Sequence, residues 1–187
     1  GTTTNTFLVT DASGNTATCS FDVIITDDEL PTITCPADVS INVDPASCEA
    51  ANVTLGTPTT TDNCSGVSVT NDAPDTFPLG NTTVIWTVTD DSGNSVTCEQ
   101  KVTVTDNINP TFVETLPIDD TVECNAIPDA ATLTATDNCE TPDVIFQEEK
   151  IDGSCISNYT IKRTWIATDA SGLTTTHTQT ITVQDTT

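Results

Sequence analysis

One motif, repeated at a fixed spacing, constrains the fold of this chain more than any other feature. The run Val-Thr-Asp-Ala-Ser-Gly-Asn at Val9 returns as Val-Thr-Asp-Asp-Ser-Gly-Asn at Val88 and as Ala-Thr-Asp-Ala-Ser-Gly-Leu at Ala167, 79 residues apart in both cases. Repetition at a fixed period is typical of chains built from tandem units. The expected units are residues 1–28, 29–107 and 108–187. We expect the first unit to be truncated to the last two strands of a domain.

Within each unit the residues follow the pattern of β-strands. Threonine and β-branched apolar residues alternate on both sides of Asp-Asp-Ser-Gly-Asn at 90–94, where Gly93 is free to adopt the positive φ of a turn. This pattern predicts a β-hairpin at 83–105, with equivalents at about 5–26 and 160–183. Since no window shows a helical stripe, the predicted fold class is all-β, with tandem immunoglobulin-like β-sandwich domains.

Three aromatic residues occupy equivalent positions on the first strand of each predicted hairpin: Phe7, Trp86 and Trp165. A large aromatic side chain at a fixed place in a sandwich is typical of the core. We therefore expect Trp86 and Trp165 to be buried, whereas Phe7 belongs to the truncated unit, where one apolar face of an isolated hairpin is expected to stay exposed to water.

The charge of the chain excludes some classes of partner. It carries 28 acidic and 4 basic residues, a formal net charge of -24. Nucleic-acid binding requires clusters of lysine and arginine that neutralise phosphates, so we expect no nucleic-acid partner. A surface this acidic attracts cations, and calcium is the divalent cation that prefers carboxylate oxygens. Calcium is therefore the expected cofactor.

The eight cysteines indicate disulfides and an oxidising compartment. Neighbouring cysteines lie at least 13 residues apart, which excludes the close Cys-x2-4-Cys pairs of structural zinc sites. When the second and third units are aligned, Cys35 falls opposite Glu114 and Cys98 opposite His177. Because the third unit has lost both cysteines together, we expect a bond between Cys35 and Cys98.

Once Cys35 and Cys98 are paired, four of the other cysteines can be paired by their separation in the sequence. The expected pairs are Cys48 with Cys64, and Cys124 with Cys139, because the two pairs have nearly the same separation. Cys19 and Cys155 have no expected partner in this chain.

Several short motifs resemble a known family. In the second unit they are Cys35-Pro36, Asp62-Asn63-Cys64, Phe77-Pro78-Leu79-Gly80 and the run 88–94 followed by Cys98. Together they resemble the hyalin repeat, or HYR domain. The third unit is similar to a bacterial variant of it, through Val122-Glu123-Cys124, 133–139, Asp152-Gly153-Ser154-Cys155, Asn158-Tyr159-Thr160 and Arg163-Thr164-Trp165. That variant commonly has a cysteine where this chain has Ser171. In the variant, this cysteine is the candidate partner of the residue equivalent to Cys155.

The resemblance implies an extracellular or cell-surface, non-catalytic module of a long repeat protein, used for adhesion or as a structural spacer, for instance within a fibre. It implies neighbouring repeats or copies of the same chain as partners, with an unknown adhesion target. The residues agree, since the chain has one histidine and no Gly-rich phosphate loop, and no stretch approaches the length of a membrane span. The alternative is a carbohydrate-binding accessory module of a secreted enzyme. That function needs exposed aromatic residues, and aromatic residues are only 4% of the chain.

Acidic residues gather where the linker and two loops of each sandwich share one pole. Carboxylate and amide oxygens at such a pole would suit calcium, whereas Asp and Asn are also common in solvated turns. The candidate ligands are Asp27, Asp28, Glu29, Asp62, Asp90 and Asp91 for the second unit, and Asp106, Asp137 and Asp169 for the third. We expect a filled site to stiffen the junction between consecutive domains.

Short motifs also mark candidate glycosylation sites. Asn52, Asn81 and Asn158 fit the N-glycosylation pattern. Thr121 and Thr186 lie in Asp-Thr-x sequences that resemble an acceptor of bacterial O-glycosylation.

Overall fold

The computed structural model describes residues 1–155 and 158–185. These residues form β-strands and contain no helix. The strands are β1 (Thr2–Thr10), β2 (Thr16–Ile24), β3 (Thr32–Thr34), β4 (Val39–Asn42), β5 (Glu49–Ala51), β6 (Thr59–Thr61), β7 (Val67–Asn71), β8 (Thr76–Pro78), β9 (Gly80–Asp90), β10 (Ser95–Thr105), β11 (Thr111–Phe112), β12 (Asp120–Glu123), β13 (Ala135–Thr136), β14 (Asp143–Cys155), β15 (Asn158–Thr168) and β16 (Thr174–Gln184). In the described part of the chain, no helix is long and apolar enough to cross a membrane.

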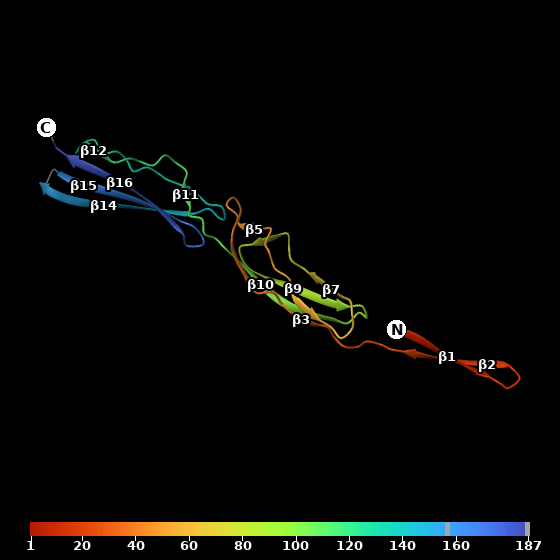
Figure 1. The fold of residues 1–187 in the computed structure, drawn as a ribbon. Coiled ribbons are helices and arrows are strands. Elements are labelled where there is room, and N and C mark those ends of the chain that lie inside the picture. The colour runs from red at the N-terminus through yellow and green to blue at the C-terminus, as the bar shows by residue number, and fades with distance from the viewer. Residues whose placement is uncertain (156–157, 186–187) are drawn as a thin grey trace. The chain divides into compact units, whose positions relative to one another are not determined.

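Strand pairing stays within the ranges of the three expected units. β1 pairs with β2 alone. The second range has a four-stranded sheet in the order β4-β10-β9-β7 and two small ladders, β3-β6 and β5-β8. The third has a four-stranded sheet in the order β12-β16-β15-β14 and one ladder, β11-β13. These elements can be followed in Figure 1. The all-β class predicted from the alternating pattern is confirmed.

Grouping by compactness cuts across these ranges. The chain divides into one unit of Gly1–Val39, Thr54–Pro74 and Thr83–Lys101, and another of Ser40–Val53, Asp75–Thr82 and Val102–Thr187. The division falls within β9 and within β10, so each of these long strands has residues in both units.

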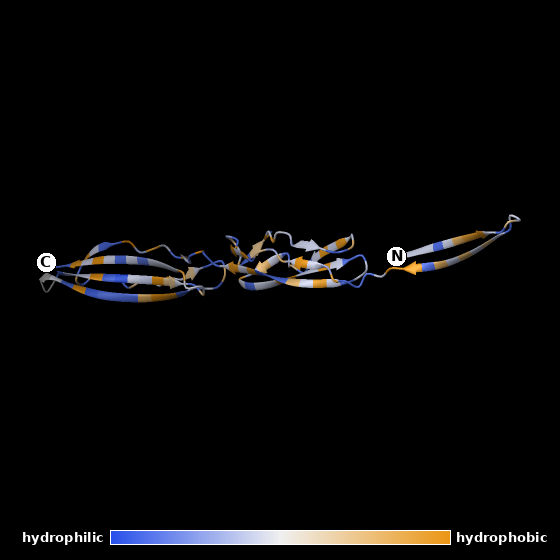
Figure 2. Cartoon of the chain, turned by 60° about the horizontal axis from the view of Figure 1, so that its bottom comes forward, coloured by the Kyte–Doolittle hydropathy of each residue, from blue (hydrophilic) through white to orange (hydrophobic). Residues whose placement is uncertain are grey.

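The long hairpins lie where the repeated Asp-x-Ser-Gly motif predicts them. β9 is joined to β10, and β15 to β16, through turns in which Gly93 and Gly172 have positive φ. Their inward residues are buried at every second position, as expected of a strand with one face on a core. Figure 2 shows hydrophobic and hydrophilic bands alternating along the strands near the C-terminus.

The three aromatic residues differ in burial as the truncation of the first unit predicts. Trp86 and Trp165 are 6% and 1% exposed, but Phe7 on β1 is 60% exposed and stacks on Phe21. Phe7 is exposed because β1 and β2 pair only with each other, so no second layer of described residues covers that face.

A buried glutamine holds Trp86, which the sequence pattern did not predict. Gln100 is fully buried; its Oε1 accepts from Trp86 Nε1 at 3.0 Å, and its Nε2 donates to two backbone carbonyls, of Ala37 and Leu55. A buried amide that makes all these bonds is stable in a core. In the third range Gln179 donates to the Ile118 carbonyl, while Trp165 donates to the backbone.

The disulfides agree with one expected pair and contradict the other two. Cys35 is bonded to Cys98, as the joint loss of both cysteines predicts. Cys48, however, is bonded to Cys139, and Cys64 and Cys124 are exposed thiols. The expected pairs Cys48–Cys64 and Cys124–Cys139 are therefore wrong.

Strand register explains why the within-unit pairs do not form. Cys124 directly follows β12, whose Glu123 pairs with Gln184 at the end of β16. Cys139 precedes β14, whose Asp143 pairs with Thr168 beside the opposite end of the hairpin. An eleven-residue strand spans roughly 35 Å, whereas bonded cysteines need Cα atoms within about 7 Å. The same argument separates Cys48 from Cys64 along β10.

At the position of the lost disulfide, the third range has two separate polar contacts. Both carboxylate oxygens of Glu114 accept from Thr134, one from its backbone N–H and one from its hydroxyl. The His177 ring is hydrogen-bonded to the Pro117 carbonyl at 2.8 Å and packs against Trp165. The replacement residues are thus bound to other partners and not to each other.

Candidate functional site

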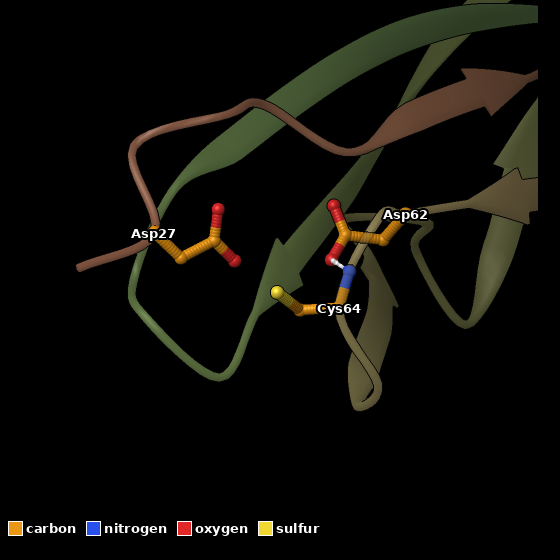
Figure 3. Close-up of side chains that lie close together, drawn as sticks. All are labelled: Asp27, Asp62 and Cys64. Atoms are coloured by element: carbon orange, nitrogen blue, oxygen red, sulfur yellow. Dashed lines mark hydrogen bonds between the residues drawn. The ribbon is translucent and has the colours of Figure 1, made fainter. Parts of the chain in front are cut away.

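The first candidate site joins the segment after β2 to the loop after β6. Asp27 lies in that segment, and Asp62 and Cys64 lie in the loop. Each residue offers one ligand atom, and these atoms lie within 4.8 Å of one another. Figure 3 shows the three side chains converging, with the Cys64 backbone N–H donating to Asp62 Oδ2 at 3.0 Å.

A second group with the same residue types occurs in the third range. Asp106, Asp137 and Cys139 have ligand atoms within 4.8 Å of one another. The Cys139 N–H donates to Asp137 Oδ2, again at 3.0 Å. The two Asp-Asn-Cys loops therefore share one internal conformation, in which the aspartate accepts from the backbone two residues ahead, as in other Asx turns. Here the cysteine sulfur belongs to a disulfide.

Both groups hold buried carboxylate oxygens that lack a hydrogen-bond donor among the described residues. These atoms are Asp27 Oδ2 and Asp62 Oδ1 in the first group, and Asp137 Oδ1 in the second, where Asn138 Oδ1 is also unpartnered. Burying a charged oxygen without a donor or cation is costly. Two carboxylates facing one space add mutual repulsion. A bound cation would relieve both costs.

The remaining acidic residues of the second unit have other roles or positions. Asp90 caps the hairpin turn: its Oδ1 accepts from the N–H groups of Ser92 and Asn94, and its Oδ2 accepts from Asn94 Nδ2. Burial raises the pKa of Asp90, but these turn bonds outweigh it, so the pKa lies below its usual range. Glu29 accepts from Asn63. Asp28 and Asp91 are exposed and lie outside the group.

Asp169 is the third-range equivalent of Asp90 and lacks part of that turn network. Its Oδ1 accepts from the Leu173 N–H at 2.8 Å, but its Oδ2 is buried and unpartnered. The reason is in the sequence: Asn94 supplies the second bond in the other turn, and leucine stands in its place here. Asp169 is not among the grouped ligand atoms, although Ser171 of the same turn donates to Asp106.

The Cys64 thiol lies in an acidic environment. A hydrogen bond with Asp27, then burial, and then the negative charges of Asp27, Asp62 and Asp90 raise the pKa of Cys64 above its ordinary value. A thiol of this kind stays protonated near neutral pH, and the thiolate is the form that reacts and that binds metals.

The ligand types that both groups have in common indicate which cation they suit. A free thiol would favour a soft metal such as zinc, but only the first group has one. Both groups contain a carboxylate pair, whereas the cysteine of the second group is in a disulfide. Oxygen ligands of this kind fit a hard cation such as calcium.

The candidate glycosylation residues lie on the surface where they are described. Asn52, Asn81, Thr121 and Asn158 are exposed. Asn81 accepts from the Thr103 hydroxyl, and Asn52 has a φ of 54°. Thr186 lies outside the described residues.

Sequence reasoning missed that the cysteine of each Asp-Asn-Cys loop lies beside the carboxylate pair. The signal was present, because the triplet recurs in both units. In the sequence, however, the cysteine of the triplet indicates only a disulfide.

Comparison with solved structures finds extracellular cadherin chains. The extracellular domain of protocadherin gamma B4 is 13% identical, with a TM-score of 0.39, over 98% of this chain and 38% of that chain. Domains 1–4 of protocadherin gamma B7 are 13% identical, with a TM-score of 0.41, over 97% of this chain and 57% of that chain. Domains EC1–4 of Drosophila N-cadherin are 13% identical, with a TM-score of 0.29, over 98% and 58%. The chain thus spans less than two thirds of each.

Comparison with family models agrees with the resemblance found for the second unit. The match covers residues 26–104, from the segment that holds Asp27 to the end of β10, and includes the Cys35–Cys98 disulfide. Residues 26–104 match the model of the HYR domain.

Proposed function

We propose that this chain is a non-catalytic segment of an extracellular repeat protein, with a structural and adhesive role, and that calcium binds at the two equivalent carboxylate groups. The observation that carries the proposal is the repetition of one arrangement: an aspartate from an interdomain segment faces an Asp-Asn-Cys loop, and both sites hold buried oxygens without donors. The proposed domain boundaries are 1–28, 29–107 and 108–187.

The proposed role of the cation is mechanical. Each interdomain segment already makes polar contacts with the following hairpin turn: Asn94 Nδ2 donates to the Asp27 carbonyl, and Asn109 Nδ2 donates to the Thr174 carbonyl. A cation held by both Asp27 and Asp62 would fix the segment to the loop as well. Interdomain joints are mobile by default, so such a site would stiffen the array.

Homotypic contact is the second part of the proposal. The β1–β2 hairpin exposes a set of large apolar residues: Phe7, Leu8, Val9, Phe21, Val23, Ile24 and Ile25. The equivalent residues of β9–β10 and β15–β16 bury one face. We propose that strands of an adjoining repeat, or of another copy of the chain, cover this hairpin. An isolated two-stranded hairpin is at best marginally stable.

Isothermal titration calorimetry of the full chain with calcium chloride tests the cation proposal. We expect binding that Asp62→Asn and Asp137→Asn each reduce, because each removes one charge from a different group. The matched control is Asp75→Asn, an exposed aspartate outside both groups. If the two site variants bind calcium like the control variant, the carboxylate pairs are not the sites.

A further inference from the structure

The two Asp-Asn-Cys loops share their internal conformation but differ in what binds to them. In the third range, Asn138 Nδ2 donates to the Ser47 carbonyl at 2.9 Å, and Cys139 is bonded to Cys48. The loop thus holds a Ser-Cys segment that comes from the preceding repeat.

In the second range the same loop has no such segment among the described residues. The Cys64 N–H donates to Asp62 as its equivalent does, but the Asn63 amide donates instead to Glu29 and Cys64 is an exposed thiol. Both side chains that would hold a Ser-Cys segment are in place.

The complementary cysteine occurs in the third range. Cys48 follows β4, the edge strand beside β10, and Cys124 follows β12, the edge strand beside β16. Both cysteines lie in the bend or turn after that strand. Cys124, like Cys64, is an exposed thiol. It occupies the position from which Cys48 bonds to the following repeat.

We infer that the Cys48–Cys139 bond is one link of a repeating cross-link, in which the cysteine after the edge strand of each repeat bonds to the Asp-Asn-Cys cysteine of the next. Cys64 is then the acceptor for a preceding repeat, and Cys124 the donor to a following one. The partner repeat belongs either to the same polypeptide or to a second copy. This inference rests on the repeat organisation and does not require the cation.

The bond forms by oxidation of two thiols. Each thiol loses a proton and one electron, a sulfur–sulfur bond forms, and a disulfide oxidant such as oxidised glutathione takes up the two electrons and two protons to give two thiols. In the array, every junction between complete repeats would then carry a covalent bridge beside its linker.

The test extends the full chain by one repeat. A copy of residues 30–107 is added after Thr187, which aligns with Glu29, so that Cys124 precedes a new Asp-Asn-Cys loop in natural register. The original Cys64 is replaced by serine, so that every Cys64 peptide comes from the added copy. After oxidation with oxidised glutathione, we expect non-reducing peptide mapping to recover a peptide that joins Cys124 to the Cys64 of the added copy. Cys124→Ser is the matched control. In this variant we expect two fewer thiols to be oxidised, and the Cys64 of the added copy to be recovered as a free thiol.

A bond within one molecule, a bond between two molecules and the absence of this bond give different products. A Cys124–Cys64 bond within one molecule assigns the link to successive repeats, and the same bond in disulfide-linked dimers of the 187-residue chain assigns it to a second copy. If the added Cys64 is recovered as a thiol, or bonded to the Cys48 of its own repeat, the inference is overturned. A Cys48–Cys64 peptide from the 187-residue chain would overturn it independently.

Discussion

Replacing Leu173 by asparagine should stabilise the third repeat. The change restores the donor that the other hairpin turns possess: Asn15 and Asn94 each place Nδ2 at 2.8 Å from the capping aspartate. In the third turn the corresponding oxygen, Asp169 Oδ2, is buried and unpartnered, and Asp169 as a whole is 7% exposed. The backbone bond from residue 173 to Asp169 Oδ1 is unaffected, because asparagine keeps its N–H.

The magnitude follows from two opposing effects. A hydrogen bond to a buried charged group contributes about 1.5–3 kcal/mol. Leu173 is half-buried, and removing its apolar side chain costs about 1 kcal/mol, roughly half the value for full burial. The net gain is therefore about 1 kcal/mol, which raises the melting temperature of a domain of this size by roughly 4–8 °C.

Thermal unfolding followed by circular dichroism measures this effect, in chelator so that no cation competes for Asp169. The reciprocal variant, Asn94→Leu, should lower the stability of the second repeat, because it removes the donors to both Asp90 and the Asp27 carbonyl. If Leu173→Asn lowers the melting temperature while Asn94→Leu leaves it unchanged, the reasoning about the turn network is refuted.

Three further predictions concern the thiol, a carboxylate and the first hairpin. Asp27→Asn should speed alkylation of Cys64 at neutral pH, because Asp27 raises the pKa of that thiol. The rate should rise on the order of tenfold for each unit by which the pKa falls. Mass spectrometry with Cys124 as internal reference measures the rate, and an unchanged rate would show that Asp27 has no influence. Bonds from the Thr134 N–H and hydroxyl hold the pKa of Glu114 below its ordinary value of 4.5, so its stabilising effect is complete above that pH and is lost as the pH falls through the lower folded value. Urea unfolding of the wild type and Glu114→Gln should therefore differ more at pH 7 than at pH 3, and an equal difference at both would contradict this. Amide exchange in residues 2–24 of the dilute chain should be fast, since one apolar face is uncovered, and strong protection would show that the hairpin needs no partner.

The fold was predictable from sequence where the decisive signal is local. The repeated Asp-x-Ser-Gly turn and the alternating residues around it predict each long hairpin, and equivalent positions predict the burial of Trp86 and Trp165. The exposure of Phe7 does not follow from the hairpin's own pattern, because burial depends on a second layer, and none of the described residues covers that face.

The disulfides show the limit of aligning units with one another. The Cys35–Cys98 bond was found because both cysteines are absent together from the third unit. Cys48 and Cys64 both have counterparts there, so the alignment does not distinguish a bond within a unit from one between units. Only strand register, which places the two cysteines at opposite ends of a hairpin, decides in favour of Cys139.

The candidate cation site was predictable in composition but not in detail. An Asp in a turn motif serves equally well as a cap or as a ligand, and sequence alone does not separate the two. Asp90 is fully used by the turn, whereas Asp27 and Asp62 keep oxygens without donors. That difference depends on which donors surround each carboxylate in the folded chain, which emerges only in three dimensions.

The central claim is that the two carboxylate pairs hold calcium and that this stabilises the folded chain. The most direct measurement is thermal unfolding of the intact chain in calcium and in chelator, beside the double variant Asp62→Asn with Asp137→Asn. A ligand that binds only the folded state stabilises it by about 2.7 kcal/mol at a hundredfold excess over its dissociation constant. We predict a higher melting temperature in calcium for the wild type and no calcium response in the double variant. Identical curves for the wild type in calcium and chelator, or an equal calcium response in the double variant, would contradict the account.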